Sequence, residues 1–202
     1  MKTIKQAKFV KSISSAGQYQ SFDMPEIILV GRSNVGKSSI INMLANNKKL
    51  AKVSSSQGKT RLINFFEINN EFILTDLPGY GFALASRDEQ NRWKKMIDGY
   101  ITTSKNIKCA VLLVDIRHTP SEKDKQMFDF LSFNNISITI VATKYDKIKP
   151  SEKIRRVKDI ALAFKVATDN IFLTSSETGF GKQELVDRIY QFVEVNDENL
   201  RD

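Results

Sequence analysis

Several features that would place this sequence in an unusual class are scarce or missing. No apolar run approaches the length of a membrane span, and the chain has no internal repeat or low-complexity segment. The residues after Met1 include no apolar segment of the kind that a secretory signal needs, so we expect a cytoplasmic protein. The one cysteine, Cys109, lies inside an apolar run, which favours a buried structural thiol over a reactive or metal-binding one.

The composition is that of an ordinary folded domain with an excess of positive charge. The 202 residues are 41% hydrophobic and 27% charged, and we expect one domain with a real core. The net charge of +8 permits binding to a polyanion such as RNA, or to an anionic membrane surface. A lysine-rich surface that contacts only water would give the same charge, so this alternative stays open.

A phosphate-binding motif organises the chain. Residues Gly31 to Ser38 (GRSNVGKS) fit the pattern G-x-x-x-x-G-K-[ST]. An apolar run at 27–30 precedes the motif as a strand, and a helix is predicted from residue 39 to about residue 45. In this setting backbone N–H groups surround a polyphosphate, and the helix N-terminus adds its positive dipole end. We expect Lys37 to reach the β- and γ-phosphates and the Ser38 hydroxyl to bind Mg²⁺.

The remaining hydrophobic pattern predicts an α/β fold. Apolar runs predict strands at 27–30, 61–68, 71–75, 108–115, 136–142 and 171–174. Helical periodicity predicts further helices at 89–103, 121–133, 150–164 and 182–193. The second and third strands form a hairpin through Asn69-Asn70, and the later strands alternate with helices. We therefore expect a mostly parallel six-stranded sheet with one antiparallel strand and helices on both faces.

Three segments are expected along the chain. Residues 1–24 form a basic N-terminal arm, in which 8–13 can add an edge strand to the sheet. Residues 25–195 form the nucleotide-binding domain, and residues 196–202 form a charged tail that frays. In the helix at 150–164, the residues expected to face the core are Ile154, Val157, Ile160, Ala161 and Phe164.

The residues that follow each strand are the next candidates, because ligands of parallel sheets bind beyond the carboxyl ends of the strands. Asp76-Leu77-Pro78-Gly79 follows the strand at 71–75. We expect the Asp76 carboxylate to reach the Mg²⁺ site through a water, and the Gly79 N–H to sense a γ-phosphate. A plain turn is the alternative, and the phosphate motif upstream disfavours it.

Two later loops predict which nucleotide is bound. In Thr143-Lys144-Tyr145-Asp146, the Asp146 carboxylate can accept from N1–H and N2–H₂ of guanine, a donor pair that adenine lacks. The Lys144 stem can lie along the base. Most GTPases have asparagine where Thr143 stands, which leaves Asp146 with most of the selectivity. Backbone N–H groups of Ser175-Ser176-Glu177 can bond guanine O6.

A polar stretch after the first helix supplies the second candidate for a direct Mg²⁺ ligand. Thr60 directly precedes the strand at 61–68, and its neighbours Gly58 and Lys59 suit a loop that orders around a γ-phosphate. The competing hydroxyls are those of the serines at 54–56. A solvated Thr60 that only starts the strand is the alternative.

These motifs resemble the EngB (YihA/YsxC) family, within the translation-factor-related, Era/TrmE-like P-loop GTPases. The resemblance runs from about Phe9 to Val193. It rests on Pro25-Glu26, the phosphate motif, Gly58-Lys59-Thr60-Arg61, Asp76-Leu77-Pro78-Gly79-Tyr80-Gly81, Asp115-Ile116-Arg117-His118 and Thr143-Lys144-Tyr145-Asp146. It implies a GTPase that acts in assembly of the large ribosomal subunit, with rRNA and ribosomal proteins as partners. It also implies a link to cell division and septation.

The motifs and the resemblance together predict the site. The expected nucleotide-binding residues are Gly31, Arg32, Ser33, Asn34, Val35, Gly36, Lys37, Ser38, Ser39, Gly58, Lys59, Thr60, Arg61, Leu62, Asp76, Leu77, Pro78, Gly79, Thr143, Lys144, Tyr145, Asp146, Ser175, Ser176 and Glu177. The expected catalytic residues are Lys37, Thr60 and Gly79. The expected Mg²⁺ ligands are Ser38, Thr60 and, through a water, Asp76. K⁺ is a second candidate cofactor, because Asn34 stands where potassium-dependent relatives carry an asparagine; alternatively, Asn34 only shapes the loop.

The sequence also predicts slow hydrolysis and weighs against two other classes of protein. Tyr80 stands where Ras-like switches have the glutamine that orients water, and of the arginines only Arg61 is a candidate finger. A signalling GTPase that recruits protein effectors at a membrane, without RNA, would want a lipid anchor, and residues 199–202 contain no cysteine for one. Asp146 disfavours an ATP-using kinase or ATPase. We expect a monomeric GTP-driven switch.

Overall fold

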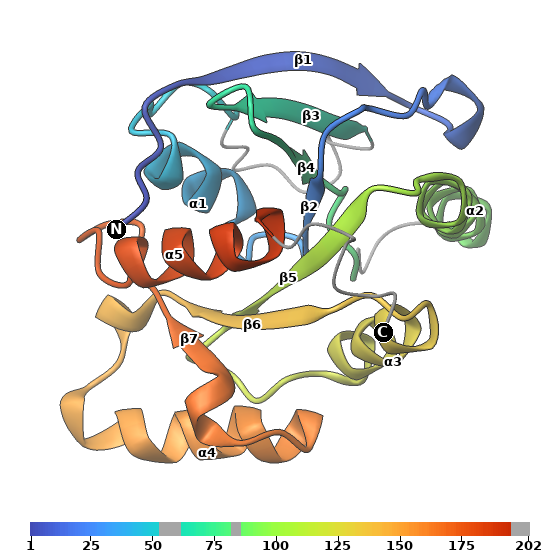
Figure 1. Cartoon of the computed structure of the whole chain (residues 1–202). Coiled ribbons are helices and arrows are strands. Elements are labelled where there is room, and N and C mark those ends of the chain that lie inside the picture. Colours follow the sequence, from blue (N-terminus) through green and yellow to red (C-terminus); the bar gives the residue numbers. More distant parts are fainter. Residues whose placement is uncertain (53–61, 82–85, 195–202) are drawn as a thin grey trace, which may run out of the picture.

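The computed structural model describes residues 1–52, 62–81 and 86–194, which form a seven-stranded sheet with helices on both faces (Figure 1). The strand order is β1-β3-β4-β2-β5-β6-β7. The bounds are β1 Ala7–Ile13, β2 Glu26–Gly31, β3 Ile63–Ile68, β4 Phe72–Asp76, β5 Ile107–Asp115, β6 Ile138–Thr143 and β7 Ile171–Leu173. β3 is antiparallel to both of its neighbours, and every other adjacent pair is parallel. The predicted sheet with one antiparallel strand is confirmed, and the N-terminal arm adds β1 at its edge.

The two faces of the sheet carry different helices. The helices are α1 Lys37–Leu44, α2 Arg87–Thr103, α3 Glu122–Phe133, α4 Lys153–Phe164 and α5 Lys182–Val193. Ile27 and Leu29 of β2 lie in the core cluster with α1 and α5, whereas Ile28 and Val30 lie in the cluster with α2, α3 and α4. Both faces are buried, which explains why residues 27–30 of β2 form an unbroken apolar run rather than an alternating one.

Cys109 of β5 is part of this core. It is 1% exposed, and burial raises the pKa of its thiol to about 11. The prediction of a buried structural thiol is confirmed, because a thiol with so high a pKa is not a reactive thiolate near neutral pH.

Three helices differ from the prediction at their N-terminal ends, and the first of them, α1, begins at Lys37, two residues earlier than predicted. α2 begins at Arg87 because Ser86 and Glu89 cap each other: Glu89 N donates to Ser86 Oγ at 3.3 Å, and Ser86 N donates to Glu89 Oε2 at 3.0 Å. The helix predicted at 150–164 is divided into a 3₁₀ turn, Pro150–Glu152, and α4. The expectation that Ile154 faces the core is wrong. The residue is 72% exposed, because the first turn of α4 extends past the core against which Val157 packs.

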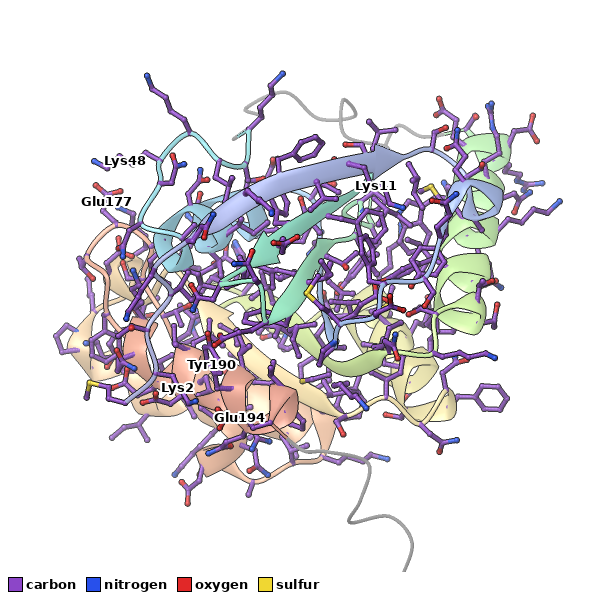
Figure 2. All side chains as sticks on the ribbon, turned by 45° about the horizontal axis from the view of Figure 1, so that its top comes forward. Lys2, Lys11, Lys48, Glu177, Tyr190 and Glu194 are labelled. Atoms are coloured by element: carbon purple, nitrogen blue, oxygen red, sulfur yellow. The ribbon has the colours of Figure 1, made fainter. Side chains whose placement is uncertain are left out.

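The N-terminal arm is fastened at both of its ends. β1 pairs with β3 from Ala7 opposite Ile68 to Ile13 opposite Ile63. Figure 2 shows Lys2 beside Tyr190 and Glu194, where its ammonium is paired with Glu194 and lies over the Tyr190 ring.

Among the residues that the structure describes, no helix combines the length and the apolar character needed to span a membrane. The predicted tail at 196–202 lies outside the described residues.

Candidate nucleotide site

The phosphate motif connects β2 to α1 at the carboxyl edge of the parallel strands. Its backbone is left-handed at Asn34 (φ 64°) and Gly36 (φ 110°). Gly31 has no room for a side chain, because a Cβ there would lie 2.8 Å from Val35 Cγ1 and 2.9 Å from Leu113 O. α1 begins directly after Gly36, so the residues at 37–39 lie in its first turn. The N–H groups of a first helical turn have no intrahelical partner and attract anions.

The loop after β4 packs against the phosphate motif. Ser33 N donates to Tyr80 O at 3.0 Å, and Tyr80 N donates to Gly31 O at 3.3 Å. Gly79 lies so close that a Cβ there would be 2.9 Å from Ser33 N and 3.1 Å from Lys37 Nζ. The structure therefore brings together Lys37 and Gly79, which the sequence assigns to the γ-phosphate end of a nucleotide.

Lys37 and Asp76 place opposite charges at the base of these two loops. Burial lowers the pKa of Lys37 below its usual value, and the charge of Asp76 opposes this shift. Burial raises the pKa of Asp76, although Lys37 and Asn64 act in the other direction. Oδ1 of Asp76 and Oγ of Ser33 are buried and have no hydrogen-bond partner within the described part of the chain. Buried polar atoms are rarely left so, and each such atom calls for an explanation such as a bound ion, ligand or water.

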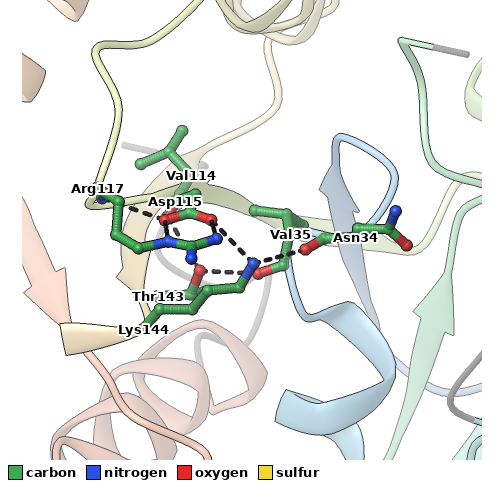
Figure 3. Close-up of polar contacts among 7 residues, drawn as sticks. All are labelled: Asn34, Val35, Val114, Asp115, Arg117, Thr143 and Lys144. Atoms are coloured by element: carbon green, nitrogen blue, oxygen red, sulfur yellow. Dashed lines mark hydrogen bonds and ion pairs between the residues drawn. The ribbon is translucent and has the colours of Figure 1, made fainter. Parts of the chain in front are cut away.

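The end of β6 is bonded to the phosphate motif (Figure 3). The hydroxyl of Thr143 lies 2.8 Å from Val35 O and 3.2 Å from Val114 O, and the residue is 2% exposed. Thr143 therefore holds the backbone of the phosphate motif instead of presenting its side chain to a ligand. The next residue, Lys144, is left-handed (φ 62°), and its ammonium donates to Asn34 O at 2.8 Å.

A carboxylate at the end of β5 joins the same cluster. Lys144 Nζ donates to Oδ2 of Asp115 at 2.8 Å. Arg117 holds this carboxylate through Nε, Nη2 and the backbone N, at 2.9, 2.7 and 3.1 Å. Burial by itself would raise the pKa of Asp115, but the hydrogen bonds from Arg117 and Lys144 lower it to about 2.

The guanine-reading candidate is oriented by the loop after β7. The Ser175 hydroxyl donates to Oδ1 of Asp146 at 2.6 Å, and Lys147 is paired with Oδ2 at 2.9 Å. The hydrogen bond from Ser175, followed by that from Lys147, lowers the pKa of Asp146. Ser175 is buried, whereas Ser176 and Glu177 are exposed. The pairing fixes Asp146 as a carboxylate with a defined orientation, which is the form that accepts two hydrogen bonds.

The remaining predicted residues fall into four groups. Tyr145 forms the first: its N donates to Thr174 O at 3.1 Å, and its ring stacks on Phe180. Leu77 and Pro78 support the loop after β4: Leu77 N donates to Leu29 O at 3.1 Å, and Pro78 O accepts from Trp93 Nε1 at 2.9 Å. Arg32 and Leu62 are exposed. The residues outside the described part of the chain are Gly58, Lys59, Thr60 and Arg61, with the competing serines Ser54, Ser55 and Ser56.

Three residues that shape the site have no role in the sequence prediction. Asp115 ends β5 and Arg117 follows it, at the same edge as the predicted loops, so their position was a usable signal. Asn64 lies inside a strand and belongs to no motif. It influences Asp76 because the register of the hairpin places it opposite that residue.

The parallel sheet, the phosphate motif and the loops beside it define a P-loop GTPase. The sequence profile of the family described as 50S ribosome-binding GTPase matches residues 26–144. A probable GTP-binding protein EngB from Desulfatibacillum aliphaticivorans is 41% identical over 194 residues, which is 96% of this chain and 95% of that protein. One from Bacillus cereus is 45% identical over 194 residues, 95% of this chain and 98% of that protein. The chain belongs to the EngB family of GTP-hydrolysing proteins.

Solved structures agree with this assignment. The crystal structure of a probable GTP-binding protein engB matches with a TM-score of 0.68 at 28% identity, over 85% of this chain and 99% of that one. The crystal structure of Aquifex aeolicus Era bound to GDP and AlF₄⁻ matches with a TM-score of 0.68 at 22% identity, over 87% of this chain and 58% of that one. The second likeness concerns the fold alone.

Proposed function

We propose that this GTPase is a slow, GTP-driven switch that acts in the cytoplasm during assembly of the large ribosomal subunit. The observation that carries the proposal is the match of residues 26–144 to a family described as 50S ribosome-binding GTPase. Its partners are then GTP, GDP and the large subunit or its precursor, and no membrane anchor is required. A link to normal cell division and septation belongs to the same proposal through the family resemblance.

Phosphate and metal binding are assigned to the loops after β2 and β4. The N–H groups of the first turn of α1 and the Lys37 ammonium bind the β- and γ-phosphates, and Gly79 N–H bonds the γ-phosphate. Ser38 and Thr60 are proposed as direct Mg²⁺ ligands, with Asp76 acting through a water. The unpartnered Oδ1 of Asp76 fits this role, because Mg²⁺ prefers oxygen ligands and keeps several waters. Bound Mg²⁺ supplies positive charge beside the phosphates.

Guanine recognition is assigned to Asp146. Its carboxylate accepts from N1–H and N2–H₂ of the base, and Ser175 keeps it oriented. Lys144, fixed by its ammonium at Asn34 O, leaves its aliphatic stem available to the face of the base. Thr143 contributes indirectly by holding the phosphate motif at Val35.

Hydrolysis is assigned to Lys37, Thr60 and Gly79, which stabilise charge at the γ-phosphate. Tyr80 does not replace the glutamine of Ras-like switches, because its phenol is directed to Asp124. Turnover is therefore slow unless a partner or a monovalent cation adds positive charge. K⁺ near Asn34 is one candidate for such a cation.

A cationic surface after β6 supports the ribosomal partner. Its residues are Lys147, Lys149, Lys153, Arg155, Arg156 and Lys158. Glu152 is shared by two of them, with N–O distances of 3.5 Å to Arg155 and 3.8 Å to Arg156, so it does not neutralise both. Lys149 and Lys158 are exposed. Such a surface suits the phosphates of rRNA.

The proposal is tested by co-sedimentation of the protein with large ribosomal subunits, in GTP or GDP, over a range of salt concentrations. We expect binding to fall steeply with salt, and the variant Lys149→Glu/Lys158→Glu to bind at least about tenfold more weakly with a shallower slope. Lys94→Glu/Lys95→Glu on α2 is the matched control, because it makes the same charge change on another exposed surface. Binding that depends neither on salt nor on either pair of substitutions, or no binding at all, would instead favour a signalling GTPase whose effectors are proteins.

A further inference from the structure

We propose that Asp115 and Arg117 are positioning residues of the nucleotide site, which hold Lys144 on the backbone of the phosphate motif and so slow nucleotide release. This inference rests on the proposed assignment of these loops to the nucleotide. It adds a role for the loop after β5, which the sequence prediction leaves without one.

The contacts form one continuous chain of charged groups across three loops (Figure 3). Arg117 donates three hydrogen bonds to the Asp115 carboxylate, at 2.7 to 3.1 Å. Oδ2 of Asp115 accepts from Lys144 Nζ at 2.8 Å, and the same ammonium donates to Asn34 O at 2.8 Å. The ends of β5 and β6 are thereby tied to the turn that surrounds the phosphates.

Lys144 needs such an anchor for two reasons. Its backbone is in the left-handed region, which is unfavourable for a non-glycine residue. Its side chain also loses rotamer entropy when the ammonium is fixed. The side chain of Lys144 is 28% exposed, so water competes with the single bond from its ammonium to the neutral carbonyl of Asn34. The ionised Asp115 adds a charge-assisted bond, which is about twice as strong as a neutral one.

Arg117 in turn keeps the carboxylate in place. Its guanidinium supplies two parallel N–H bonds, a geometry that lysine cannot reproduce. The side chain of Asp115 is only 15% exposed, so losing Arg117 would leave it with Lys144 as its one cationic partner among the described residues. The carboxylate could then turn away from Lys144, and the phosphate motif would lose its connection to β5.

The arrangement predicts which kinetic step depends on the pair. Asp115 contacts Lys144, and Lys144 in turn contacts the backbone of Asn34, so the pair acts on the shape of the loop through Lys144. The loop surrounds the phosphates of GDP and of GTP. Loss of the Asp115–Arg117 pair should therefore raise the dissociation rates of both nucleotides. The chemical step depends on Lys37, Gly79 and Thr60, and at saturating GTP it should be unchanged.

The test measures dissociation of a fluorescent GDP analogue, chased with excess GDP, and GTP turnover at saturation. We expect Asp115→Asn and Arg117→Ala to raise the dissociation rate about tenfold, and kcat to stay within about twofold. Arg117→Lys should raise the dissociation rate less than Arg117→Ala does, but should not restore the rate of the parent. Lysine keeps the charge but lacks the two parallel N–H donors of the guanidinium. Lys125→Ala, which removes an exposed ion pair with Glu122, is the matched control and should change neither quantity.

A double-variant cycle separates positioning from a general effect on the fold. In a Lys144→Ala background, Asp115→Asn should add little to the dissociation rate, because the group that it positions is gone. Additive effects, or unchanged dissociation in folded Asp115→Asn and Arg117→Ala proteins, would overturn the proposal. If Lys144→Ala and Asp146→Asn also leave dissociation unchanged, the assignment of these loops to the nucleotide fails as well. A faster rate in Lys144→Ala alone leaves that assignment standing and removes only the role of the pair.

Discussion

The phenol of Tyr80 donates a hydrogen bond to Oδ1 of Asp124 at 2.8 Å. Asp124 is 3% exposed and also accepts from Ser121 N at 2.7 Å, at the start of α3. Burial, followed by the neighbouring Asp124, raises the pKa of Tyr80. Tyr80 therefore connects the loop after β4 to α3 through its side chain, and connects the same loop to the phosphate motif through its backbone.

Tyr80→Phe should separate these two functions of the loop. The ring is kept and only the hydroxyl is lost, so we expect the basal rate of GTP hydrolysis to stay within about twofold. The buried Asp124 loses one donor, which should lower the free energy of unfolding by about 1–3 kcal/mol. Single-turnover hydrolysis and urea unfolding measure the two effects. Tyr80→Ala should also keep the basal rate but lose about 3–5 kcal/mol, because it leaves a cavity. A rate at least about tenfold lower in Tyr80→Phe would show that the phenol helps to place the water.

Asp146→Asn should change which base is bound. The substitution replaces one acceptor oxygen by an amide donor, so guanine meets a donor where N1–H or N2–H₂ needs an acceptor. We expect GTP affinity to fall about 100-fold, the cost of losing a charged hydrogen bond and opposing a donor, and xanthine nucleotides to be favoured. Ser175→Ala removes the donor to Oδ1 and should weaken GTP binding by a smaller factor. Calorimetric titration with GTP and XTP checks both variants, and equal GTP affinity in Asp146→Asn would reject the assignment.

The order of the elements could be predicted because their signals are local. The cores of β2, β4, β5 and β7 are apolar runs, and the phosphate motif fixes the turn between β2 and α1. The start of α2 was also accessible, since Ser86 and Glu89 have the spacing of a capping box. The exposure of Ile154 could not be predicted, because helical spacing assigns this residue to the inner face of the helix and does not indicate where the core ends.

The sequence could predict which loops form the site, but it could not predict most of the contacts between their residues. Strand-following positions converge whatever their side chains, which is why Asp76, Asp146 and Ser175 could be placed together. The partner of the Thr143 hydroxyl is the backbone of Val35, 108 residues away in sequence, and no motif encodes that bond. The bond between Lys144 and Asp115 depends on the pairing of β5 with β6 and on a left-handed backbone. Both arise from tertiary packing.

Potassium is the subject of a further prediction. Asn34 is exposed and left-handed, and its carbonyl oxygen already accepts from Lys144. The side chain remains available for a monovalent cation beside the phosphates, where positive charge would stabilise the transition state. If K⁺ acts there, GTP turnover should be at least about tenfold faster in K⁺ than in Na⁺ at matched ionic strength, and Asn34→Ala should remove the difference. Equal turnover of the parent protein in the two salts would leave Asn34 with the shaping of the loop alone.

The contribution of Asp76 to stability should depend on pH. Burial raises the pKa of this carboxyl in the folded protein, so its contribution to stability is fully present below its unfolded pKa and is lost as the pH rises through the folded value. Asp76→Asn removes that ionisation. In nucleotide-free protein with chelator, the stability of the variant relative to the parent should therefore be greater near pH 8 than near the unfolded pKa of Asp76. The same substitution should weaken Mg²⁺-dependent GTP binding about tenfold or more, because Asp76 can no longer hold the metal-bound water as a carboxylate. Urea unfolding at both pH values and a Mg²⁺ titration of nucleotide binding give the two results. Lys37→Ala is the companion variant. Burial lowers the pKa of Lys37, so removing its charge should leave the protein folded while triphosphate binding is lost. If the stability of Asp76→Asn relative to the parent does not rise with pH, or if the Mg²⁺ requirement is unchanged, the burial of this carboxylate beside Lys37 is not what prepares the site for the metal.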